Sequence, residues 1–462
     1  MTTLDPSHWS ERLAVLAERH GVPGAQLGIL RLGSNGDDDE RVEMATGVLS
    51  TRTGFAASPD ALFQIGSITK VWTATLVLML VDEGRVSLDT PVREIIPEFR
   101  LADDDVAGAV TVRHLLTHTS GIDGDLLVDT GRGDDCLERY LDVLATAEQS
   151  HPLAATWSYC NSGYTLLGRI VEVLTGGTWD AALRSRLIEP LGLGRTATLP
   201  EEVLLHAAAI GHDDATGTVL PVTRWHMPRS SGPAGVISAA AGDVLDFARL
   251  HLTGGIAPDG TRLLSPASAA AMVAHEVDLP DPYVLGDSWG LGWIRFDWNS
   301  RRLYGHDGNT LGQAAYLRVL PDAGLAVVLL TNGGHARDLF ETLFREIFSD
   351  AAGAEMRHPF APPADAAAAD VAEYAGRYER VGATLEVEDG PDGPTLRTIA
   401  TGPVAALLPN ARHEYRMHAA EPGVFAVRPE GTDTWLPVTF YRLDDGTPYV
   451  HYGARAARRV TT

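Results

Sequence analysis

The segment Phe63-Gln-Ile-Gly-Ser67-Ile-Thr-Lys70 holds the single lysine among the 37 basic residues of the chain. Arginine keeps its proton inside proteins, whereas a desolvated lysine can release it. Ser67 precedes Lys70 by three positions, so the two side chains share one face of a helix. An amine of this kind can activate a serine hydroxyl as a nucleophile. The other interpretation is structural, with Ser67 as a helix cap and Lys70 in a salt bridge.

A helix is expected from Ser67 to about Glu83. It is apolar nearly all round, which predicts burial on every face. The partial positive charge at its N-terminus favours an alkoxide or an oxyanion. Burial disfavours the charged form of Lys70. Both effects favour a nucleophile beside its base.

The second polar element is Trp157-Ser-Tyr159-Cys160-Asn161, just before a predicted helix that ends at Gly176. Tyr159 and Asn161 are two residues apart and can point into one cleft, where the phenol relays a proton and the amide binds the serine–lysine pair or a substrate amide. A packed tyrosine and a helix cap are the structural alternative. Cys160, between them, is expected to point away into packing.

The third element is Tyr304-Gly-His306-Asp-Gly308-Asn309-Thr-Leu-Gly312, at the end of a predicted strand. Glycines such as Gly308 let the backbone approach a substrate closely. The backbone N–H of Asn309, beside that of Ser67, can form an oxyanion hole. His306 can hold or transfer a proton near neutral pH; otherwise it is a surface histidine in a glycine-rich turn.

Composition narrows the function classes. A length of 462 residues indicates two domains, and 45% hydrophobic and 21% charged residues are typical of a globular protein. The net charge of −24 argues against nucleic acid as a partner. The longest apolar run, residues 71–81, is too short to cross a bilayer, so no membrane association is expected. Two cysteines form no disulfide framework, and the N-terminus resembles no signal peptide, which predicts a cytoplasmic location.

Strand and helix signals alternate in a recognisable order. A helix from Pro6 to about His20 is followed by two strands, a long helical region, four more strands and a closing helix, which predicts an α+β fold with an antiparallel sheet flanked by helices. The strands are expected at 25–32, 41–47, 289–298, 301–306, 313–320 and 325–331, and the closing helix at 336–350.

The last hundred residues differ in pattern. Short alternating runs separated by Gly, Pro and Asp turns predict a small antiparallel β-barrel. We therefore expect a first domain at 1–355, a Pro/Ala-rich linker at 356–370 and a barrel domain at 371–462.

Taken together, Ser-x-x-Lys, Tyr-x-Asn and His-x-Gly resemble the β-lactamase and DD-peptidase superfamily of serine acyl enzymes. The Tyr-x-Asn form resembles its class C β-lactamase, esterase and D-aminopeptidase branch. Leu115-Leu-Thr-His-Thr-Ser-Gly121, Pro190-Leu-Gly-Leu and Gly290-Leu-Gly-Trp293 are similar to that branch too. The segment Tyr374-Ala-Gly-Arg-Tyr378 resembles the lipocalin-like domain appended to many such proteins.

The resemblance implies a role for each residue. Ser67 is the nucleophile, Lys70 the general base, Tyr159 the partner that exchanges a proton with Lys70, and Asn161 a substrate-orienting amide. Gly308 and Asn309 are implied to bind the substrate and its oxyanion, and His306, on the same strand, is implied to be catalytic. The reaction needs no metal and no organic cofactor, and the partner is a small-molecule, ester or peptide substrate. The oligomeric state is left open.

Several functions stay open. The acyl group on Ser67 can pass to water, in a hydrolase, or to an amine, in an acyltransferase or a peptide cyclase. A catalytically inactive binding protein is a third class. Family β-lactamases usually carry lysine where this chain has His306, so β-lactam hydrolysis is doubtful. A zinc site is conceivable because His114 and His118 have helical i, i+4 spacing, although the glutamate of His-Glu-x-x-His is absent.

Overall fold

The computed structural model describes residues 4–33, 38–213, 218–364, 370–391, 393–405 and 410–460. Its larger sheet has eight antiparallel strands in the order β2-β1-β13-β12-β11-β10-β9-β8. The bounds of these strands are β1 Gly24–Arg31, β2 Glu40–Gly47, β8 Val277–Asp278, β9 Ser288–Trp289, β10 Ile294–Trp298, β11 Arg301–Thr310, β12 Gln313–Leu320 and β13 Leu325–Thr331. The predicted antiparallel sheet is therefore present, and the chain closes it by pairing β1 with β13.

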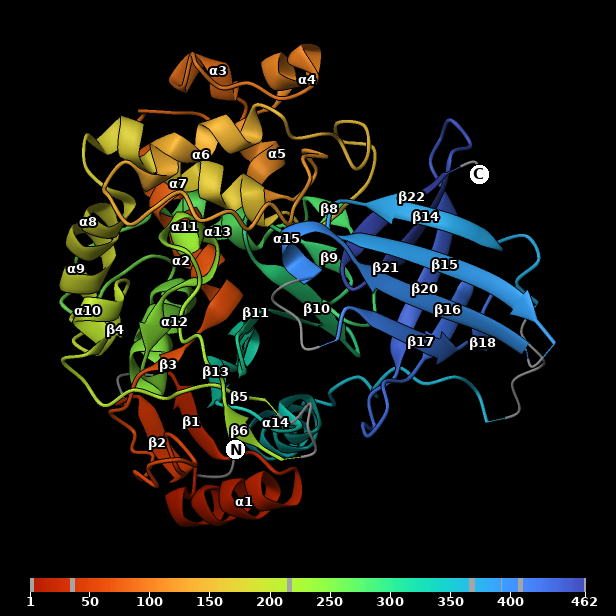
Figure 1. Ribbon diagram of the computed structural model, residues 1–462. Coiled ribbons are helices and arrows are strands. Elements are labelled where there is room, and N and C mark those ends of the chain that lie inside the picture. Colours follow the sequence, from red (N-terminus) through yellow and green to blue (C-terminus); the bar gives the residue numbers. More distant parts are fainter. Residues whose placement is uncertain are drawn as a thin grey trace.

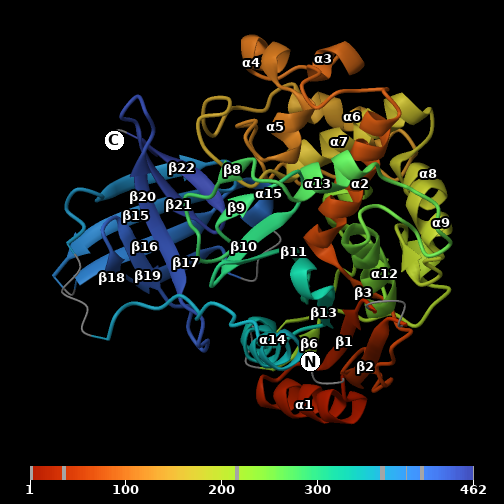
Figure 2. The same cartoon turned by 180° about the vertical axis from the view of Figure 1, so that it is seen from behind.

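Helices cover both faces of this sheet (Figure 1). Helices α1 (Pro6–Arg19) and α14 (Ala336–Ala352) pack side by side on one face, as both views show (Figure 2). On the other face lie α2 (Thr69–Asp82) and α12 (Ala241–Leu252), with one hydrophobic cluster on each side of the sheet. The predicted α+β class, an antiparallel sheet flanked by helices, is confirmed.

Helices α7 (Asn161–Thr175), α8 (Trp179–Leu183), α11 (Gly232–Gly235) and α13 (Pro266–Val273) pack against α2, which explains why that helix is apolar on nearly all sides. Every residue of α2 from Thr69 to Leu80 is buried. The helices that complete this region are α3 Val92–Ile95, α4 Asp104–Ala109, α5 Val112–Leu116, α6 Cys136–Leu144, α9 Glu189–Leu191 and α10 Pro200–Val203, with shorter 3-10 or π turns at Gly66–Ile68, Arg184–Ile188, Arg229–Ser231 and Pro321–Ala323. The predicted helix at Ser67 thus begins as a 3-10 turn and becomes α-helical at Thr69.

Short strands connect this helical region. They are β3 Phe63–Gln64, β4 Thr196–Ala197 and β7 Ser238–Ala239 in one small sheet, and β5 His212–Asp213 with β6 Leu220–Pro221 in another. Because β3 directly precedes Gly66, its pairing with β7 fixes where the first turn of α2 begins.

The C-terminal strands form a nine-stranded antiparallel sheet in the order β17-β16-β15-β14-β22-β21-β20-β19-β18. This nearly closed barrel is a lobe of its own beside the β8–β10 edge of the larger sheet (Figure 1), and it confirms the predicted small β-barrel. Its bounds are β14 Gly376–Arg380, β15 Ala383–Gly390, β16 Gly393–Ala400, β17 Arg412–Arg416, β18 His418–Glu421, β19 Val424–Val427, β20 Leu436–Arg442, β21 Pro448–Tyr452 and β22 Arg455–Val460, with the short helix α15 Gly402–Ala405. The domain boundaries at 355 and 371 stay predictions, and residues 365–369 of the predicted linker lie outside the described residues.

Two sequence predictions for the sheet were wrong. The strand expected from Trp289 to Trp298 is divided into β9 and β10, because the chain turns between them at Gly292, whose φ is +94°. The strand expected to end at His306 continues to Thr310. The sequence indicated a turn at Gly305 and Gly308. In the structure these glycines lie within the strand, where they make room for a neighbouring backbone, as described below.

A buried ion pair anchors β11 on its α14 face. The Asp307 carboxylate, 5% exposed, lies 2.5 Å from Nη1 of Arg318 and 3.5 Å from Nη1 of Arg337. The Arg318 guanidinium, 2% exposed at the side chain, lies over the rings of Phe296 and Phe340, 4.1 Å and 4.9 Å from their centroids. Asp307 follows His306 directly, so this ion pair also fixes the strand position of the histidine.

We predict that Asp307→Ala lowers the free energy of unfolding by about 3–5 kcal/mol, because it leaves the Arg318 guanidinium buried without its carboxylate. The measurement is the denaturant midpoint. The control is Asp104→Ala, which breaks the exposed Arg93–Asp104 pair and should leave the midpoint nearly unchanged. Equal midpoints for the two variants would contradict the anchoring role.

Candidate active site

Lys70 lies in the first turn of α2 with no exposed surface. Its Nζ is 3.1 Å from Ser67 Oγ, 2.7 Å from Asn161 Oδ1 and 2.6 Å from the carbonyl oxygen of Ala234. Ser67 belongs to the 3-10 turn directly before that helix, so the three-residue spacing brings the two side chains together as expected. The Ala234 carbonyl comes from α11 and was not anticipated.

The three partners of Lys70 differ in kind, and the difference matters for chemistry. A carbonyl and an amide oxygen only accept hydrogen bonds, whereas a hydroxyl both donates and accepts. A neutral amine has two N–H groups and one lone pair. Asn161 and Ala234 engage both N–H groups, which leaves the lone pair directed at the Ser67 hydroxyl. In this arrangement the amine can accept the proton of Ser67.

The environment of Lys70 favours this neutral form. Burial lowers the pKa of Lys70 well below its usual value, and the nearby Arg455 cation lowers it further, whereas the Asp125 carboxylate opposes the shift. Because the unprotonated amine is the form that can act as a base, the site disposes Lys70 toward proton transfer.

Tyr159 lies beside the amine. Lys70 Nζ is 4.7 Å from the centroid of its ring, and the ring of His306 is 6.2 Å away. No group among the described residues meets strict hydrogen-bond geometry with its buried hydroxyl, but the Ser67 side chain is close enough to oppose the rise that burial causes in the pKa of Tyr159. Burial raises the pKa of Tyr159, so the phenol keeps its proton and is able to donate it. The Tyr159 ring thus lies beside the Lys70 amine, and its role in proton exchange stays a prediction.

Asn161 is the first residue of α7, and both ends of its amide are used. Its Oδ1 accepts from Lys70, and its Nδ2 donates to Asp125 Oδ1 at 3.1 Å. The sequence predicted an amide that orients substrate. In the structure the same amide holds Lys70, and this was one of the alternatives left open for it.

The backbone of β11 approaches the nucleophile very closely. A methyl group added at Gly308 would lie 2.9 Å from the Ser67 backbone nitrogen, and one added at Gly66 would lie 2.5 Å from that of Asn309. Gly66 also has a φ of +52°, which strains any other residue. Glycine at both positions thus lets the backbone segments that carry the Ser67 and Asn309 nitrogens approach each other closely, as the predicted oxyanion hole requires.

His306 is a buried strand residue and not a surface histidine in a turn. It is 1% exposed and pairs with Leu317 across β11 and β12. Its Nδ1 lies 2.6 Å from the Asp307 carbonyl oxygen, so this nitrogen carries the proton, and the buried Nε2 has no partner among the described residues. Burial lowers the pKa of His306 to about 3, with Lys70 contributing. The imidazole is therefore neutral at pH 7, unlike a lysine at that position.

Sequence reasoning missed the charged groups that the barrel contributes. Arg455 at the start of β22 binds Asp125 through Nε at 3.0 Å and Nη2 at 2.8 Å, and Arg380 at the end of β14 binds it through Nη1 at 3.0 Å. Burial would raise the pKa of Asp125, but Arg455 and Arg380 outweigh it and lower that pKa to about 2. The stretch around Arg455, Gly-Ala-Arg-Ala-Ala-Arg-Arg, shows no strand alternation that could have marked it.

Backbone contacts join the same two regions. The Tyr159 N–H donates to the Ala454 carbonyl oxygen at 3.0 Å, and the Ala456 N–H donates to Ser158 Oγ at 3.1 Å. The Arg455 guanidinium carbon lies 4.9 Å from the centroid of the Tyr159 ring. The barrel therefore packs directly against the segment that carries Tyr159.

Cys160 and the two histidines of the zinc alternative have structural positions. Cys160 Sγ is buried, donates to the Ile122 carbonyl oxygen and accepts from the Gly163 N–H, and burial raises its pKa to about 12. Helix α5 ends at Leu116, and His118 has a φ of +58°, so His114 and His118 are not one helical turn apart. Among the described residues, no group of three or more His, Cys, Asp or Glu is arranged to bind a metal ion.

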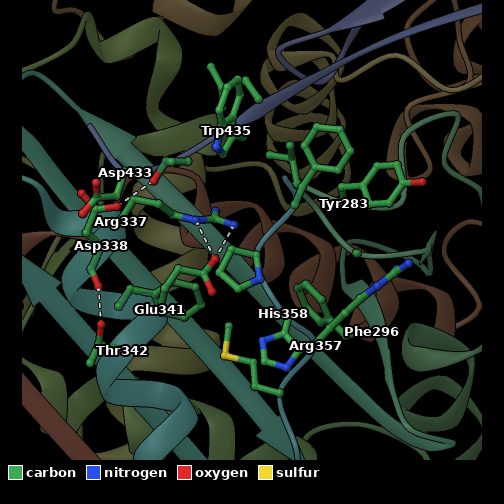
Figure 3. A pocket seen from close by; sticks show the side chains of 18 of the residues that line it. Tyr283, Phe296, Arg337, Asp338, Glu341, Thr342, Arg357, His358, Asp433 and Trp435 are labelled. Atoms are coloured by element: carbon green, nitrogen blue, oxygen red, sulfur yellow. Dashed lines mark hydrogen bonds and ion pairs between the residues drawn. The ribbon is translucent and has the colours of Figure 1, made fainter. Parts of the chain in front are cut away.

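A cavity of about 330 Å³ lies elsewhere, between α14, residues 282–287 and barrel residues 433–436 (Figure 3). Phe296 and Arg337 line it (Figure 3). Since Arg337 belongs to α14, this cavity is on the face of the sheet opposite to α2. It is therefore separate from the site around Ser67.

The comparisons with known proteins decide the family. Residues 10–352 match the family model described as beta-lactamase. The chain belongs to the β-lactamase family of serine hydrolases. It is 49% identical over 381 residues to penicillin-binding protein 4 of Amycolatopsis lactamdurans, a match that covers 82% of this chain and 98% of that protein.

Solved structures extend this similarity. The crystal structure of SurE aligns with a TM-score of 0.76 and 29% identity over 98% of this chain and 99% of SurE, so the likeness includes the barrel. A D-stereospecific amidohydrolase from Streptomyces sp. aligns with a TM-score of 0.59 and 27% identity over 74% of this chain and 99% of the amidohydrolase. Within the described residues, no helix combines the length and apolarity needed to span a membrane.

We predict that Lys70→Arg lowers kcat by about 10²–10⁴-fold while the circular dichroism spectrum is retained, because a guanidinium cannot accept the Ser67 proton. In the parent protein, activity should fall as the pH drops through the lowered pKa of Lys70, well below the usual lysine value of about 10.4. The measurement is a pH–rate profile with an activated ester. A Lys70→Arg variant as active as the parent would refute the base assignment.

Proposed function

We propose that this protein is a serine acyl-enzyme hydrolase that cleaves ester, amide or peptide bonds through Ser67. The observation that carries the proposal is the buried Lys70 amine, whose Nζ lies 3.1 Å from Ser67 Oγ, 2.7 Å from Asn161 Oδ1 and 2.6 Å from the Ala234 carbonyl oxygen, with its pKa lowered by burial. A lysine kept only for a salt bridge would need a carboxylate partner, whereas Lys70 Nζ contacts a hydroxyl, an amide oxygen and a backbone carbonyl oxygen.

The proposed cycle consists of acylation of Ser67 followed by release of the acyl group. Ser67 Oγ attacks the substrate carbonyl carbon while its proton passes to Lys70 Nζ, and the backbone N–H groups of Ser67 and Asn309 stabilise the oxyanion. The bond to the leaving group breaks as a proton returns to that group, with the Tyr159 hydroxyl as the relay. Water or an amine then attacks the ester carbonyl and gives a proton to Lys70. The ester C–O bond breaks as Lys70 returns that proton to Ser67 Oγ, which restores the starting pair.

The second candidate is transfer of the acyl group to an amine, as in an acyltransferase or a peptide cyclase. The observation that favours it is the barrel, which packs on Tyr159 and covers part of the site. Excluding water lengthens the life of a reactive acyl ester, so that a bound amine can compete for it. A cytoplasmic location remains part of the proposal only as a sequence-based expectation.

Two pockets, one lined by Asn309 and one beside Ser67, bear on the size of the substrate. A groove of about 900 Å³ begins at Asn309 and runs past Gly312 to Arg337 and the barrel residue Thr432. Ligand sites commonly have volumes of about 300–1,000 Å³. Asn309 connects this groove to the oxyanion strand, whereas its Arg337 wall belongs to α14, on the face of the sheet opposite to α2.

A smaller pocket of about 60 Å³ adjoins the nucleophile and is lined by Trp225, Met227 and Val236. Its wall includes Gly235, where an added methyl group would lie 3.9 Å from the Ser67 backbone nitrogen. The lining combines these apolar side chains with polar ones such as Gln64 and Arg229, and a pocket this close to Ser67 suits the side chain of a small acyl group.

The test of the proposed function is covalent labelling followed by partitioning. A fluorophosphonate should label the parent protein at Ser67 and leave Ser67→Ala unlabelled. With an activated acyl ester as donor, mass spectrometry should then detect free acid in water, and amide product when an amine is added if the second candidate holds. Absence of labelling would refute the acyl-enzyme, and acid alone at every amine concentration would refute transfer.

We further predict that kcat/KM for activated esters rises from an acetyl to an isovaleryl acyl group, since burying each added CH₂ contributes about 0.8 kcal/mol. Val236→Phe fills the pocket and should abolish this rise while the acetyl ester reacts at nearly the parental rate. A rise that survives in Val236→Phe would place the acyl side chain elsewhere.

A further inference from the structure

A continuous path of polar contacts leads from the barrel to the amine. Arg380 and Arg455 bind the two oxygens of Asp125, Asp125 accepts from Asn161 Nδ2, and Asn161 Oδ1 accepts from Lys70. Both arginines belong to barrel strands, whereas the other residues belong to the helical region around α2. Each link is a direct contact of 3.1 Å or less.

The position of Asp125 fixes the orientation of the Asn161 amide. An ionised carboxylate can only accept hydrogen bonds, so the NH₂ end of the amide must face Asp125 and the oxygen must face Lys70. With the amide turned over, its NH₂ group would donate to the Lys70 lone pair and compete with the Ser67 hydroxyl for it. Asp125 thus excludes the orientation that would block the base.

The arginines are needed to keep Asp125 in this role. Its side chain is only 13% exposed, and an unpaired carboxylate at such a place is costly. Arg455 binds it with two parallel hydrogen bonds, a geometry that fixes direction as well as charge. Arg380 adds a third, and its side chain and that of Arg455 are each 18% exposed.

We propose that Asp125 is a positioning residue of the active site and that the barrel holds it through Arg380 and Arg455, so that the Ser67–Lys70 pair is correctly set only when the barrel is docked. The inference rests on the proposed function, because it assigns Asp125 a role in the proton transfer from Ser67. Asp125 acts through Asn161 and touches neither substrate nor the reacting atoms.

The charges around Lys70 give this role a pH signature. The Asp125 carboxylate raises the pKa of Lys70 and the Arg455 cation lowers it. The titratable and charged groups that face Lys70 are Asp125, Arg455, Tyr159, Cys160, Tyr164, His118 and His306. Removing the Asp125 charge therefore lowers the pKa of Lys70, and the acid limb of the pH–rate profile moves to lower pH.

The experiment uses the full-length chain with an activated ester. Asp125→Asn should lower kcat by about 10–100-fold with little change in KM, because the Asn161 amide is free to turn over. Its acid limb should lie at lower pH than that of the parent. Arg380→Gln should lower kcat to a smaller extent, and Arg380→Lys should restore most of it. The control is Arg397→Gln, a barrel arginine that pairs with Glu386 and Glu414 and should leave kcat unchanged.

The double variant tests whether Arg380 acts through Asp125. In the Asp125→Asn background, Arg380→Gln should cause no further loss of kcat, since the link it supports is already broken. The inference is overturned by parental kcat and pH profile in Asp125→Asn, or by losses that multiply in the double variant. If Asp125→Asn does not fold, the Arg380→Gln and Arg380→Lys pair decides, and parental activity in Arg380→Gln overturns the inference.

Labelling of the parent protein separates this inference from the proposed function. If a fluorophosphonate fails to label Ser67 in the parent, the acyl-enzyme itself is refuted. If the parent is labelled and the Asp125 and Arg380 variants react at parental rates, only the positioning role is refuted.

Discussion

Everything at the site depends on how one buried amine distributes its hydrogen bonds. Lys70 gives its two N–H groups to oxygens that cannot return a proton, and this leaves its remaining electron pair for Ser67. The surrounding fold meets the demands of that arrangement. Helix α2, buried from Thr69 to Leu80, excludes water, α11 supplies the Ala234 carbonyl, and α7 presents Asn161 at its first turn.

The two halves of the molecule contribute different parts of the chemistry. The helical region and the larger sheet carry the residues proposed as nucleophile and base, Ser67 and Lys70, and the Ser67 and Asn309 nitrogens of the proposed oxyanion site. The barrel supplies positive charge, directed at one carboxylate, and backbone contacts to the segment of Tyr159. Similarity to SurE over 98% of this chain is consistent with the two parts forming one unit.

Sequence patterns predicted correctly those features that depend on residues close together in the chain. Ser67 and Lys70 are one turn apart, and strands such as β12 and β13 alternate or are uniformly apolar, so each could be predicted from local spacing. The extent of β11 could not, because Gly305 and Gly308 read as a turn. Gly308 is required by the close approach of the turn around Gly66, which is distant in sequence, and Gly305 by the Leu317 carbonyl oxygen of β12.

The partners of Asp125 could not be predicted from the local sequence either, because they are distant in the chain. Asp125 and Arg455 are 330 positions apart, and an aspartate in a loop or an arginine near a chain end carries no pattern of its own. The Ala234 carbonyl is likewise a backbone group, which any residue type would supply. Such features follow from the packing of whole elements, and only the assembled fold reveals them.

The solitary lysine also bears on how this protein resists proteolysis. A protease specific for lysine has one bond to cut, and that bond lies in a helix turn with no exposed side-chain surface. Cleavage therefore requires that α2 leave the interior. The rate at which the two fragments appear would then report how often the core opens. Lys70, the proposed base, is therefore also an internal probe of unfolding.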